Sequence, residues 1–451
     1  MEDEVISKEN KMGTMPINKL IISMSLPIIA SMLVQALYNI VDSIFVAQIS
    51  ENALTAVSLA FPAQNLLIAF GTGSAVGINA LLSRSLGEKN QRHVNDIARH
   101  AVIIWLVLGA IFALIGFTCG NLFFSIQTSS QDIINYGNTY FSIVVGMSVG
   151  LFGQVIFERL LQATGRSIFS MISQGTGAII NIILDPILIF GLFGMPKLGI
   201  AGAALATVIG QSIACLIALT LNLKFNSDIH ITMKNFKLKF HVIKQIYAIA
   251  IPSIIMLSIG SVMTFGMNKI LIGFSTTAAA VFGVYFKLQS FFFMPVFGLN
   301  NGLIPIIGYN LGASRPDRMK KAMFTAIKYA FAMMVLGLII FELFPKELML
   351  LFNASNHMLS IGVPALRIIA IHFPIASFCI VIGAVFQACG KSTYSLVVSL
   401  IRQLFVLLPV AYLLSLSGNI NVVWLCFPIA ELFSAIVSFY YYKRLSSNLI
   451  F

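Results

Sequence analysis

Charge is the property that this sequence has least of. Only 10% of its 451 residues are charged, compared with roughly 25% in a soluble domain. Hydrophobic residues make up 58% of the chain, and the mean hydropathy is +0.93. This composition excludes a soluble globular protein and predicts an all-α integral membrane protein.

Paired cysteines, clustered histidines and a cleavable leader are also lacking. The five cysteines stand singly with no CxxC spacing, and we interpret them as small apolar core residues. The six histidines are dispersed, so the sequence predicts no metal site, no cofactor and no catalytic histidine set. The first 16 residues have no apolar core before a small-residue cleavage site, so we expect the first helix to be retained.

Long apolar runs, by contrast, recur along the whole chain. A run of about 20 residues is long enough to cross a bilayer as a helix. The segments between the runs are short, which leaves no room for a soluble catalytic domain, so the protein is expected not to be an enzyme. Twelve spans are predicted, at 17–49, 53–83, 94–118, 132–162, 167–192, 199–223, 243–273, 278–310, 320–344, 358–388, 393–415 and 420–442.

The positive charges are distributed very unevenly among the loops. With the N-terminus placed inside, 22 lysines and arginines fall on inner segments and only Lys197 and Lys346 on outer loops. The positive-inside rule then predicts that both termini face the cytoplasm of a bacterial cell. The net charge of +12 is therefore an orientation signal. We expect that the protein does not bind nucleic acid. It is expected to contact membrane lipids and to be a monomer.

The two halves of the chain repeat each other at an offset of 225 residues. Pro27 recurs as Pro252 (252 − 27), and QATGRS at 162–167 recurs as QACGKS at 387–392. Because each half has an even number of spans, the copies share one orientation and form parallel repeats around a central cavity. We expect six-helix lobes at 17–223 and 243–444, a cytoplasmic linker at 224–242, and tails at 1–16 and 445–451.

The first span contains one carboxylate, Asp42, where an ionised group is costly. Gln35, Tyr38 and Asp42 share one helix face, and Asn39 lies beside it. We expect Asp42 to couple transport to an ion or a proton, and Gln35, Tyr38 and Asn39 to line a substrate cavity. The alternative is a buried aspartate that neighbouring helices satisfy and that has only a structural role.

The fifth span carries a second acid at a similar depth. Asn181 and Asp185 lie on one face, and Pro186 leaves a backbone carbonyl partly free. Asp42 and Asp185 lie about 12 and 10 Å from the outer ends of their helices, at the helical rise. The same estimate places polar side chains of spans four and six about 12 Å from theirs. The predicted coupling site therefore comprises Asp42, Tyr140, Asn181, Asp185 and Thr207, all but Tyr140 also being candidate ligands of Na⁺.

The second half does not repeat these acids. The positions equivalent to Asp42 and Asp185 are Met267 and Val410. Coupling through carboxylates is therefore expected in the N-terminal lobe alone.

The second half instead offers candidates for the cavity lining. Lys287 is expected to face the cavity, and pairing with Glu431 is an open alternative. For Arg367 and Arg402 we favour structural ion pairs. Aromatic and methionine side chains can bind flat lipophilic cations. The lining candidates are Lys287, Phe291, Phe292 and Met294.

An adjacent pair of opposite charges lies near the inner end of the fourth span. Glu158 and Arg159 fall within two helical turns of that end. Side chains at this depth can pair or reach the interface. We expect them to form either a structural ion pair or a cytoplasmic gate.

Several motifs together resemble one transporter family. They are SLPII with Asp42, SLGEKN, LQATGRS, NIILDPILIFG, GIAGAALAT, IPSII, YNLGA and FQACGKS. This set is similar to the multidrug and toxic compound extrusion (MATE) family, in its MepA-like and DinF-like bacterial branch. The resemblance implies a twelve-helix, V-shaped exporter driven by proton or sodium entry. It also implies that Asp42, Asn181, Asp185 and Thr207 are the family's coupling residues.

The mechanism expected from this resemblance is antiport. A lipophilic compound, expected to be cationic, binds between the lobes and leaves when protons occupy the acids, with sodium as the alternative ion. A lipid-linked oligosaccharide or lipid flippase of the same superfamily is the competing function. Such flippases often carry fourteen spans and a more cationic cavity, neither of which this sequence predicts.

Overall fold

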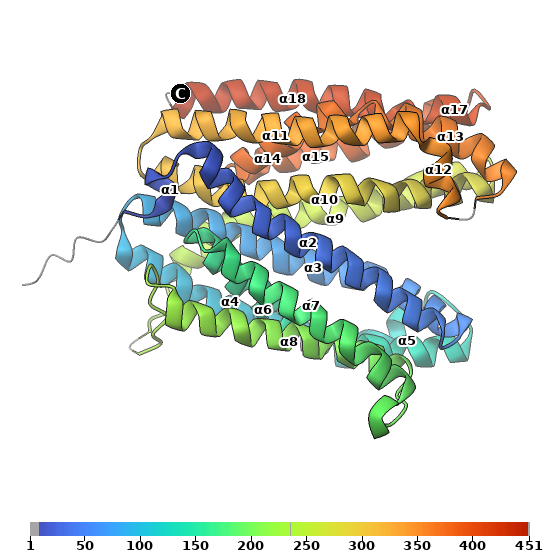
Figure 1. Cartoon of the computed structure of the whole chain (residues 1–451), viewed down its shortest axis with the longest axis horizontal. Helices are drawn as coiled ribbons and strands as arrows, with labels where there is room; N and C mark the ends of the chain where they lie inside the picture. Colours follow the sequence, from blue (N-terminus) through green and yellow to red (C-terminus); the bar gives the residue numbers. More distant parts are fainter. Residues whose placement is uncertain (1–8, 235, 353, 450–451) are drawn as a thin grey trace, which may run out of the picture.

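The computed structural model describes residues 9–234, 236–352 and 354–449, apart from the side chains at positions 39, 40, 43, 47, 51, 54, 448 and 449. Every regular element in these ranges is a helix (Figure 1). Ten described helices are long and apolar enough to cross a membrane, and the number rises to twelve when each of two bent pairs is taken as one span. The predicted all-α fold with twelve spans is confirmed.

The first half of the chain forms one lobe. Its helices are α1 (Lys11–Thr14), α2 (Ile17–Ala47), α3 (Glu51–Gly87), α4 (Gln91–Ser125), α5 (Gln131–Val144), α6 (Val149–Ala163), α7 (Ser167–Phe190), η1 (Leu192–Gly194) and α8 (Ile200–Phe225). The predicted fourth span is broken, because α5 and α6 meet at an angle of 41°.

The second half forms the other lobe. Its helices are α9 (Phe240–Ile272), α10 (Thr276–Gly312), α11 (Pro316–Leu343), α12 (Pro345–Leu350), α13 (Asn356–Ala370), α14 (Phe373–Ala388), α15 (Ser392–Leu400), η2 (Ile401–Leu407), α16 (Leu408–Ser415), α17 (Ile420–Val423) and α18 (Cys426–Leu449). Here the tenth span is broken, with 51° between α13 and α14.

The repeat seen in the sequence extends to backbone detail. Ser50 caps α3 by accepting a hydrogen bond from the backbone of Ala53, and Ser275 caps α10 in the same way. Lys89 and Ser314, which follow these helices, both have positive φ angles, of 55° and 53°. Each pair is 225 residues apart (275 − 50 and 314 − 89), so the two lobes share both their helices and their turns.

Glycines allow the lobes to approach each other closely. A Cβ atom on Gly73 of α3 would lie 2.8 Å from the backbone nitrogen of Ile254 on α9. Its repeat partner Gly298 on α10 packs against Ile29 of α2, where a Cβ would lie 3.0 Å from the Cα. The contact between the lobes is thus made twice, once from each half, in a pseudo-symmetric arrangement.

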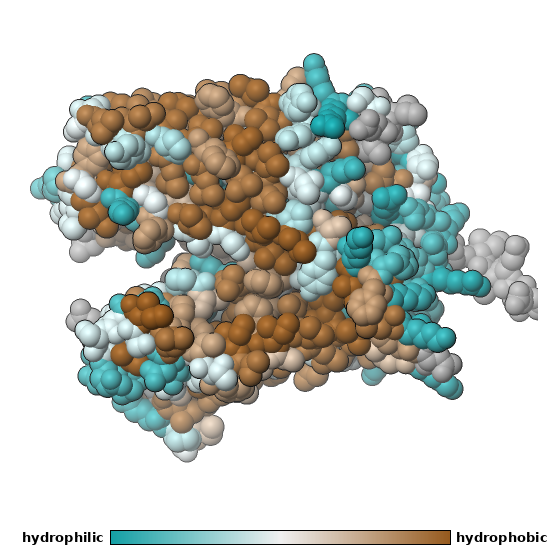
Figure 2. All heavy atoms as spheres, turned by 180° about the vertical axis from the view of Figure 1, so that it is seen from behind, coloured by the Kyte–Doolittle hydropathy of each residue, from teal (hydrophilic) through white to brown (hydrophobic). Residues whose placement is uncertain are grey.

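The two lobes diverge toward one end of the molecule. Figure 1 shows α1 and the last residues of α18 at one end, and α5, η1 and α12 at the other. A cleft between the lobes opens at the end of α5 and α12, while hydrophilic residues gather at the opposite end (Figure 2). We call the end that carries α1 the closed end.

Candidate functional site

A cavity of about 530 Å³ lies between the two lobes. Helices α2, α3, α6, α7 and α8 form its wall on one side, and α9, α10, α14, α15, η2 and α18 on the other. Carboxamide side chains dominate the polar part of this wall. They are Gln35, Gln154, Gln162, Gln174, Asn181, Gln211, Asn300, Asn301, Gln387 and Gln403.

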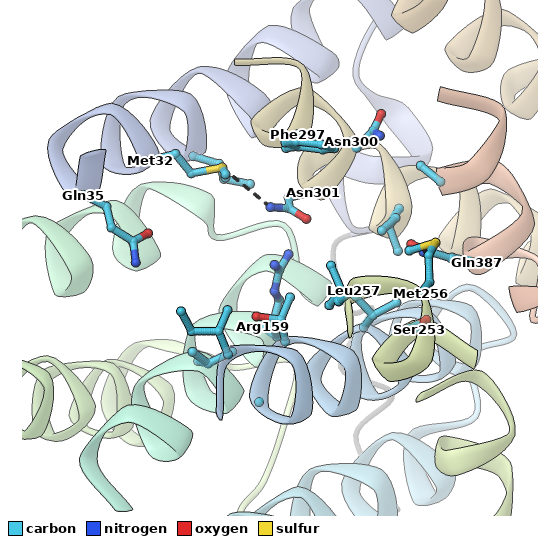
Figure 3. A pocket seen from close by; sticks show the side chains of 18 of the residues that line it. Met32, Gln35, Arg159, Ser253, Met256, Leu257, Phe297, Asn300, Asn301 and Gln387 are labelled. Atoms are coloured by element: carbon cyan, nitrogen blue, oxygen red, sulfur yellow. Dashed lines mark hydrogen bonds between the residues drawn. The ribbon is translucent and has the colours of Figure 1, made fainter. Parts of the chain in front are cut away.

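Both apolar and polar side chains point into the cavity (Figure 3). From α10, Asn301 donates a hydrogen bond of 3.8 Å to the sulfur of Met32 on α2 across the lobe boundary. Gln387 of α14 makes a similar contact of 3.9 Å with the sulfur of Met256 on α9. Amides can donate and accept, and thioethers adapt to shape, so this lining suits substrates of varied structure.

The predicted coupling residues meet behind the N-lobe wall. Asn181 on α7 donates a hydrogen bond of 3.3 Å to Thr207 on α8, and both residues line the cavity. Asp185 is fully buried one turn further along α7. Its carboxylate interacts electrostatically with that of Asp42 on α2. Three helices therefore bring these four residues to one place.

The acidic cluster has acceptor oxygens without donors. Among the described residues, no hydrogen-bond donor reaches either oxygen of Asp185, Oδ1 of Asp42 or Oδ1 of Asn181. Buried acceptors of this kind are normally paired, because leaving them unpaired costs stability. The residue types fit two partners: protons on the carboxyl groups, or a cation such as Na⁺ held by carboxylate, amide and hydroxyl oxygens.

Two tyrosines complete this cluster. Tyr140 of α5 interacts electrostatically with Asp42 and Asp185, and its hydroxyl accepts a hydrogen bond of 2.8 Å from Gln64. Tyr38 interacts with the same two acids and lines the cavity. Gln35 lines the cavity as well, and it accepts a hydrogen bond of 2.9 Å from Gln174. The side chain of Asn39, another cavity candidate, lies outside the described part of the structure.

Glu158 and Arg159, predicted to form a structural ion pair or a cytoplasmic gate, interact electrostatically, and each also has hydrogen-bond partners of its own. Glu158 accepts hydrogen bonds from Gln154 (3.2 Å) and Ser173 (3.1 Å), and Arg159 donates one of 2.9 Å to Gln162. Both charged residues line the cavity. Adjacent positions on a helix point about 100° apart, so the hydrogen bonds of these two side chains go to different partners.

The cavity candidates from α10 lie elsewhere in the described structure. Lys287 is not among the lining residues; its ammonium lies 5.9 Å from the ring of Phe352. Phe292 packs edge-on against Phe341, with ring centres 5.6 Å apart. Phe291 and Met294 are likewise absent from the described lining. The part of α10 that reaches the cavity is the later turn with Phe297, Asn300 and Asn301.

The two arginines expected to form structural pairs do so. Arg367 lies 3.8 Å from Glu342, and Arg402 lies 3.5 Å from Glu431. The second contact replaces the pairing of Glu431 with Lys287. Arg402 also lines the cavity, which the sequence did not predict.

At the closed end, a short segment that we call the N-terminal brace (residues 9–15) bridges the lobes. Asn10 donates a hydrogen bond of 3.0 Å to the carbonyl of Thr164 in the N-lobe. From the C-lobe, Arg318 donates to the carbonyls of Met12 (3.1 Å) and Met15 (2.8 Å). Met12 is fully buried, so the brace is part of the seal between the lobes.

An ion pair lies beside the brace. Arg166 and Asp228 approach to 3.5 Å. Burial raises the pKa of Asp228, and the nearby Arg166 opposes that rise. Burial, assisted by Arg166, lowers the pKa of Lys11 in the brace. The closed end is thus held by polar contacts that surrounding protein partly shields from water.

Several cavity residues were missed by sequence reasoning. Gln162 and Gln387 were noticed only as repeat markers, and both line the cavity. Asn300 and Asn301 form an amide pair inside an apolar helix between Gly298 and Gly302, a signal that could have pointed to the cavity.

A bundle of apolar helices in two related lobes, with a cavity between them, is the architecture typical of membrane transporters. The model of the MatE family matches residues 27–187 and 252–413, two segments that start 225 residues apart (252 − 27). Since this match covers most of the chain, the protein belongs to the MATE family of multidrug efflux transporters. It is accordingly a multi-pass membrane transporter and not an enzyme.

Known proteins resemble the chain along nearly its whole length. The multidrug export protein MepA of Staphylococcus haemolyticus is 30% identical over 416 residues, covering 90% of this chain and 89% of the relative. A FAD transporter of Shewanella oneidensis is 26% identical over 440 residues, covering 95% of each. A structure described as the outward-facing conformation of a multidrug resistance MATE family transporter aligns with a TM-score of 0.92 at 24% identity, covering 98% and 99%.

Proposed function

We propose that this protein is a cation-coupled antiporter that exports lipophilic compounds, cationic ones among them, in exchange for protons. The observation that carries the proposal is the group of buried acceptor oxygens without donors on Asp42, Asn181 and Asp185. These oxygens lie next to the cavity, because Asn181 itself lines the cavity and is hydrogen-bonded to Thr207, another lining residue. An ion or proton that binds there acts on the helices that hold the substrate.

The cycle that we propose alternates between two openings. In the state with the cleft open at the end of α5 and α12, protons enter and neutralise Asp42 and Asp185. Neutral acids no longer attract a cationic substrate, and α2, which contains Pro27 and so lacks one backbone hydrogen bond, can repack against α7. The substrate then leaves, and the lobes close over the cleft while the closed end opens.

We place the closed end in the cytoplasm of a bacterial cell, with both termini inside and the protein in the cell membrane. Support comes from the basic residues, which outnumber acidic ones on the segments at that end. The open cleft then faces outward, and the N-terminal brace closes the cytoplasmic side. We take the lobes to extend over 17–223 and 243–444 and the protein to work as a monomer in contact with lipids.

Protons are the favoured coupling ion, and sodium is the alternative. Two carboxylates held close in a poorly hydrated site repel each other, which favours protonation of one of them. The same oxygens, with the hydroxyl of Thr207, would also suit Na⁺. The two ions make different demands on the donors: a proton needs only a carboxyl group, whereas Na⁺ needs several oxygens at once.

The proposal is tested by uptake of ethidium into inverted membrane vesicles, driven by either an imposed pH gradient or an imposed sodium gradient. We expect the pH gradient to drive uptake by the wild type, and Asp42→Asn and Asp185→Asn to abolish it. The matched control is Asp132→Asn, because Asp132 is an exposed acid in the first turn of α5. Uptake driven by the sodium gradient alone would instead identify Na⁺ as the coupling ion.

Lack of transport under both gradients, with silent substitutions, would contradict the proposal and favour the lipid or oligosaccharide flippase. That alternative is then checked with a fluorescent lipid analogue in proteoliposomes. A flippase would equilibrate the analogue between leaflets without requiring Asp42 or Asp185.

A further inference from the structure

Arg402 is placed on the cavity by an irregular turn. The helix α15 continues into η2, a π-helical turn at Ile401–Leu407, before α16 begins. Pro409 lies two residues after this turn and cannot donate to the carbonyl one α-helical turn earlier. A π turn rotates the following residues relative to an α-helix, and such turns often occur at functional sites. Arg402 and Gln403 on this turn both line the cavity.

The guanidinium of Arg402 has donors to spare. Its one ion pair among the described residues is that with Glu431, a single distance of 3.5 Å from Nη1 to Oε2, and it also interacts electrostatically with Tyr285, His372 and Cys379. An arginine side chain carries five N–H donors in a planar fork. The Arg402 side chain is 28% exposed and that of Glu431 only 4%, so the acid lies behind and the arginine faces the cavity. The ion pair is therefore a single long contact, and the more exposed of its two side chains is the arginine.

Arg402 is one of three charged residues on the described cavity surface, and Glu431 lies behind it. The charged residues of the described lining are Glu158, Arg159 and Arg402, which give an excess of one positive charge. Asp42 and Asp185 lie behind the wall and are not in the lining. The same wall carries further polar side chains, namely Ser399 and Gln403, which are hydrogen-bonded to each other at 2.8 Å, and Ser434 and Ser438 on α18.

We propose that Arg402 forms an oxyanion subsite in the C-lobe wall, which holds the carboxylate, sulfonate or phosphate group of an amphiphilic substrate. The fork of the guanidinium binds the two oxygens together, a geometry that lysine cannot reproduce. The apolar body of the substrate lies against Met256 and Phe297. Glu431 competes for the same guanidinium and so limits the affinity of the subsite. This inference rests on the proposed export function and adds zwitterionic compounds to its substrates.

The test compares rhodamine B with its ethyl ester, two dyes that share a cationic ring system and differ in one carboxylate. Binding to the purified wild-type protein is measured by fluorescence anisotropy. We expect rhodamine B to bind at least about tenfold more tightly, as a charge-assisted hydrogen bond allows. Arg402→Gln should bring the ratio of the two affinities to about one, without weakening ester binding.

Two further variants separate recognition from folding. Glu431→Gln removes the competitor and should tighten binding of rhodamine B, a change opposite in sign to that of Arg402→Gln. Arg402→Lys keeps the charge but loses the fork, so its preference should be intermediate. Arg367→Gln is the matched control, because Arg367 pairs with Glu342 and is not in the described lining. It should leave the ratio unchanged.

The outcomes distinguish this inference from the function on which it rests. Equal affinity of the wild type for both dyes, or a preference that survives Arg402→Gln, would overturn the subsite and leave export of lipophilic cations standing. Failure of the wild type to bind either dye would overturn the subsite and count against the export function too.

Discussion

The close contact between α3 and α10 at the closed end predicts that a single methyl group opens the protein toward that side. A Cβ on Gly87 would lie 2.8 Å from the carbonyl carbon of Tyr309 and 2.9 Å from the nitrogen of Ala313. A Cβ on its repeat partner Gly312 would lie 2.9 Å from the nitrogen of Glu88. These neighbours are backbone atoms of the opposite lobe, so only separation of the lobes relieves the clash.

The size of the effect follows from this geometry. Overpacking by one methyl group costs about 1–3 kcal/mol in a well-packed contact. The cost falls only on the state in which the closed end is sealed, because the alanine methyl group meets no opposing backbone once the lobes part. The equilibrium should therefore shift by about 5- to 150-fold toward opening of this end.

A native thiol reports on this opening. Cys389 directly follows α14 at the closed end, is 8% exposed, and interacts electrostatically with Arg84 of the opposite lobe. We expect Gly87→Ala and Gly312→Ala to accelerate maleimide labelling of Cys389 in the purified protein, read by peptide mass spectrometry. Gly175→Ala is the control, because a Cβ there meets no atom within 4 Å. Labelling rates that equal the control in both variants would refute the reasoning.

Three further predictions follow from individual contacts. Asn10→Ala removes a side-chain cap of α1 and the hydrogen bond of Asn10 to the N-lobe. It should destabilise the sealed state of the closed end by about 0.5–2 kcal/mol and accelerate Cys389 labelling. Unchanged labelling would show that the brace does not contribute to the seal. Thr207→Val deprives Asn181 of its acceptor and should impair gradient-driven uptake, while Thr207→Ser restores it; equal uptake by both would count against a polar role. Trp424 is fully buried, so Trp424→Ala should lose about 3–5 kcal/mol and lower the Tm in detergent more than Trp424→Phe, and equal shifts would contradict its packing role.

Much of the fold was predictable because the bilayer imposes simple rules. A helix must be about 20 apolar residues long to span it, and this length alone locates the twelve spans. The 225-residue offset between Pro27 and Pro252 made the repeat visible in the sequence. The caps at Ser50 and Ser275 show that the repeat extends to the helix ends. Depth along each helix was enough to group Asp42 with Asp185, because straight helices convert sequence distance into height.

The direction in which a side chain points was harder to predict. Lys287 was expected in the cavity, but its orientation depends on how α10 packs against its neighbours, which periodicity in one helix does not specify. Arg402 was expected only to pair with an acid. Arg402 lies in a π turn, which changes the helical register. A helix face drawn at about 3.6 residues per turn therefore places Arg402 on the wrong side of the helix. The four-residue helix α1 gave no periodic signal at all.

The central claim is that substrate and protons exclude each other through Asp42 and Asp185. It is tested most directly by adding ethidium to the purified protein in weakly buffered solution and measuring the change in pH. The account predicts that the wild type and the Asp132→Asn variant release protons when the substrate binds. The double variant that carries both Asp42→Asn and Asp185→Asn should bind substrate without releasing protons. Proton release that persists in that double variant, or its absence from a wild type that binds substrate, would contradict the account.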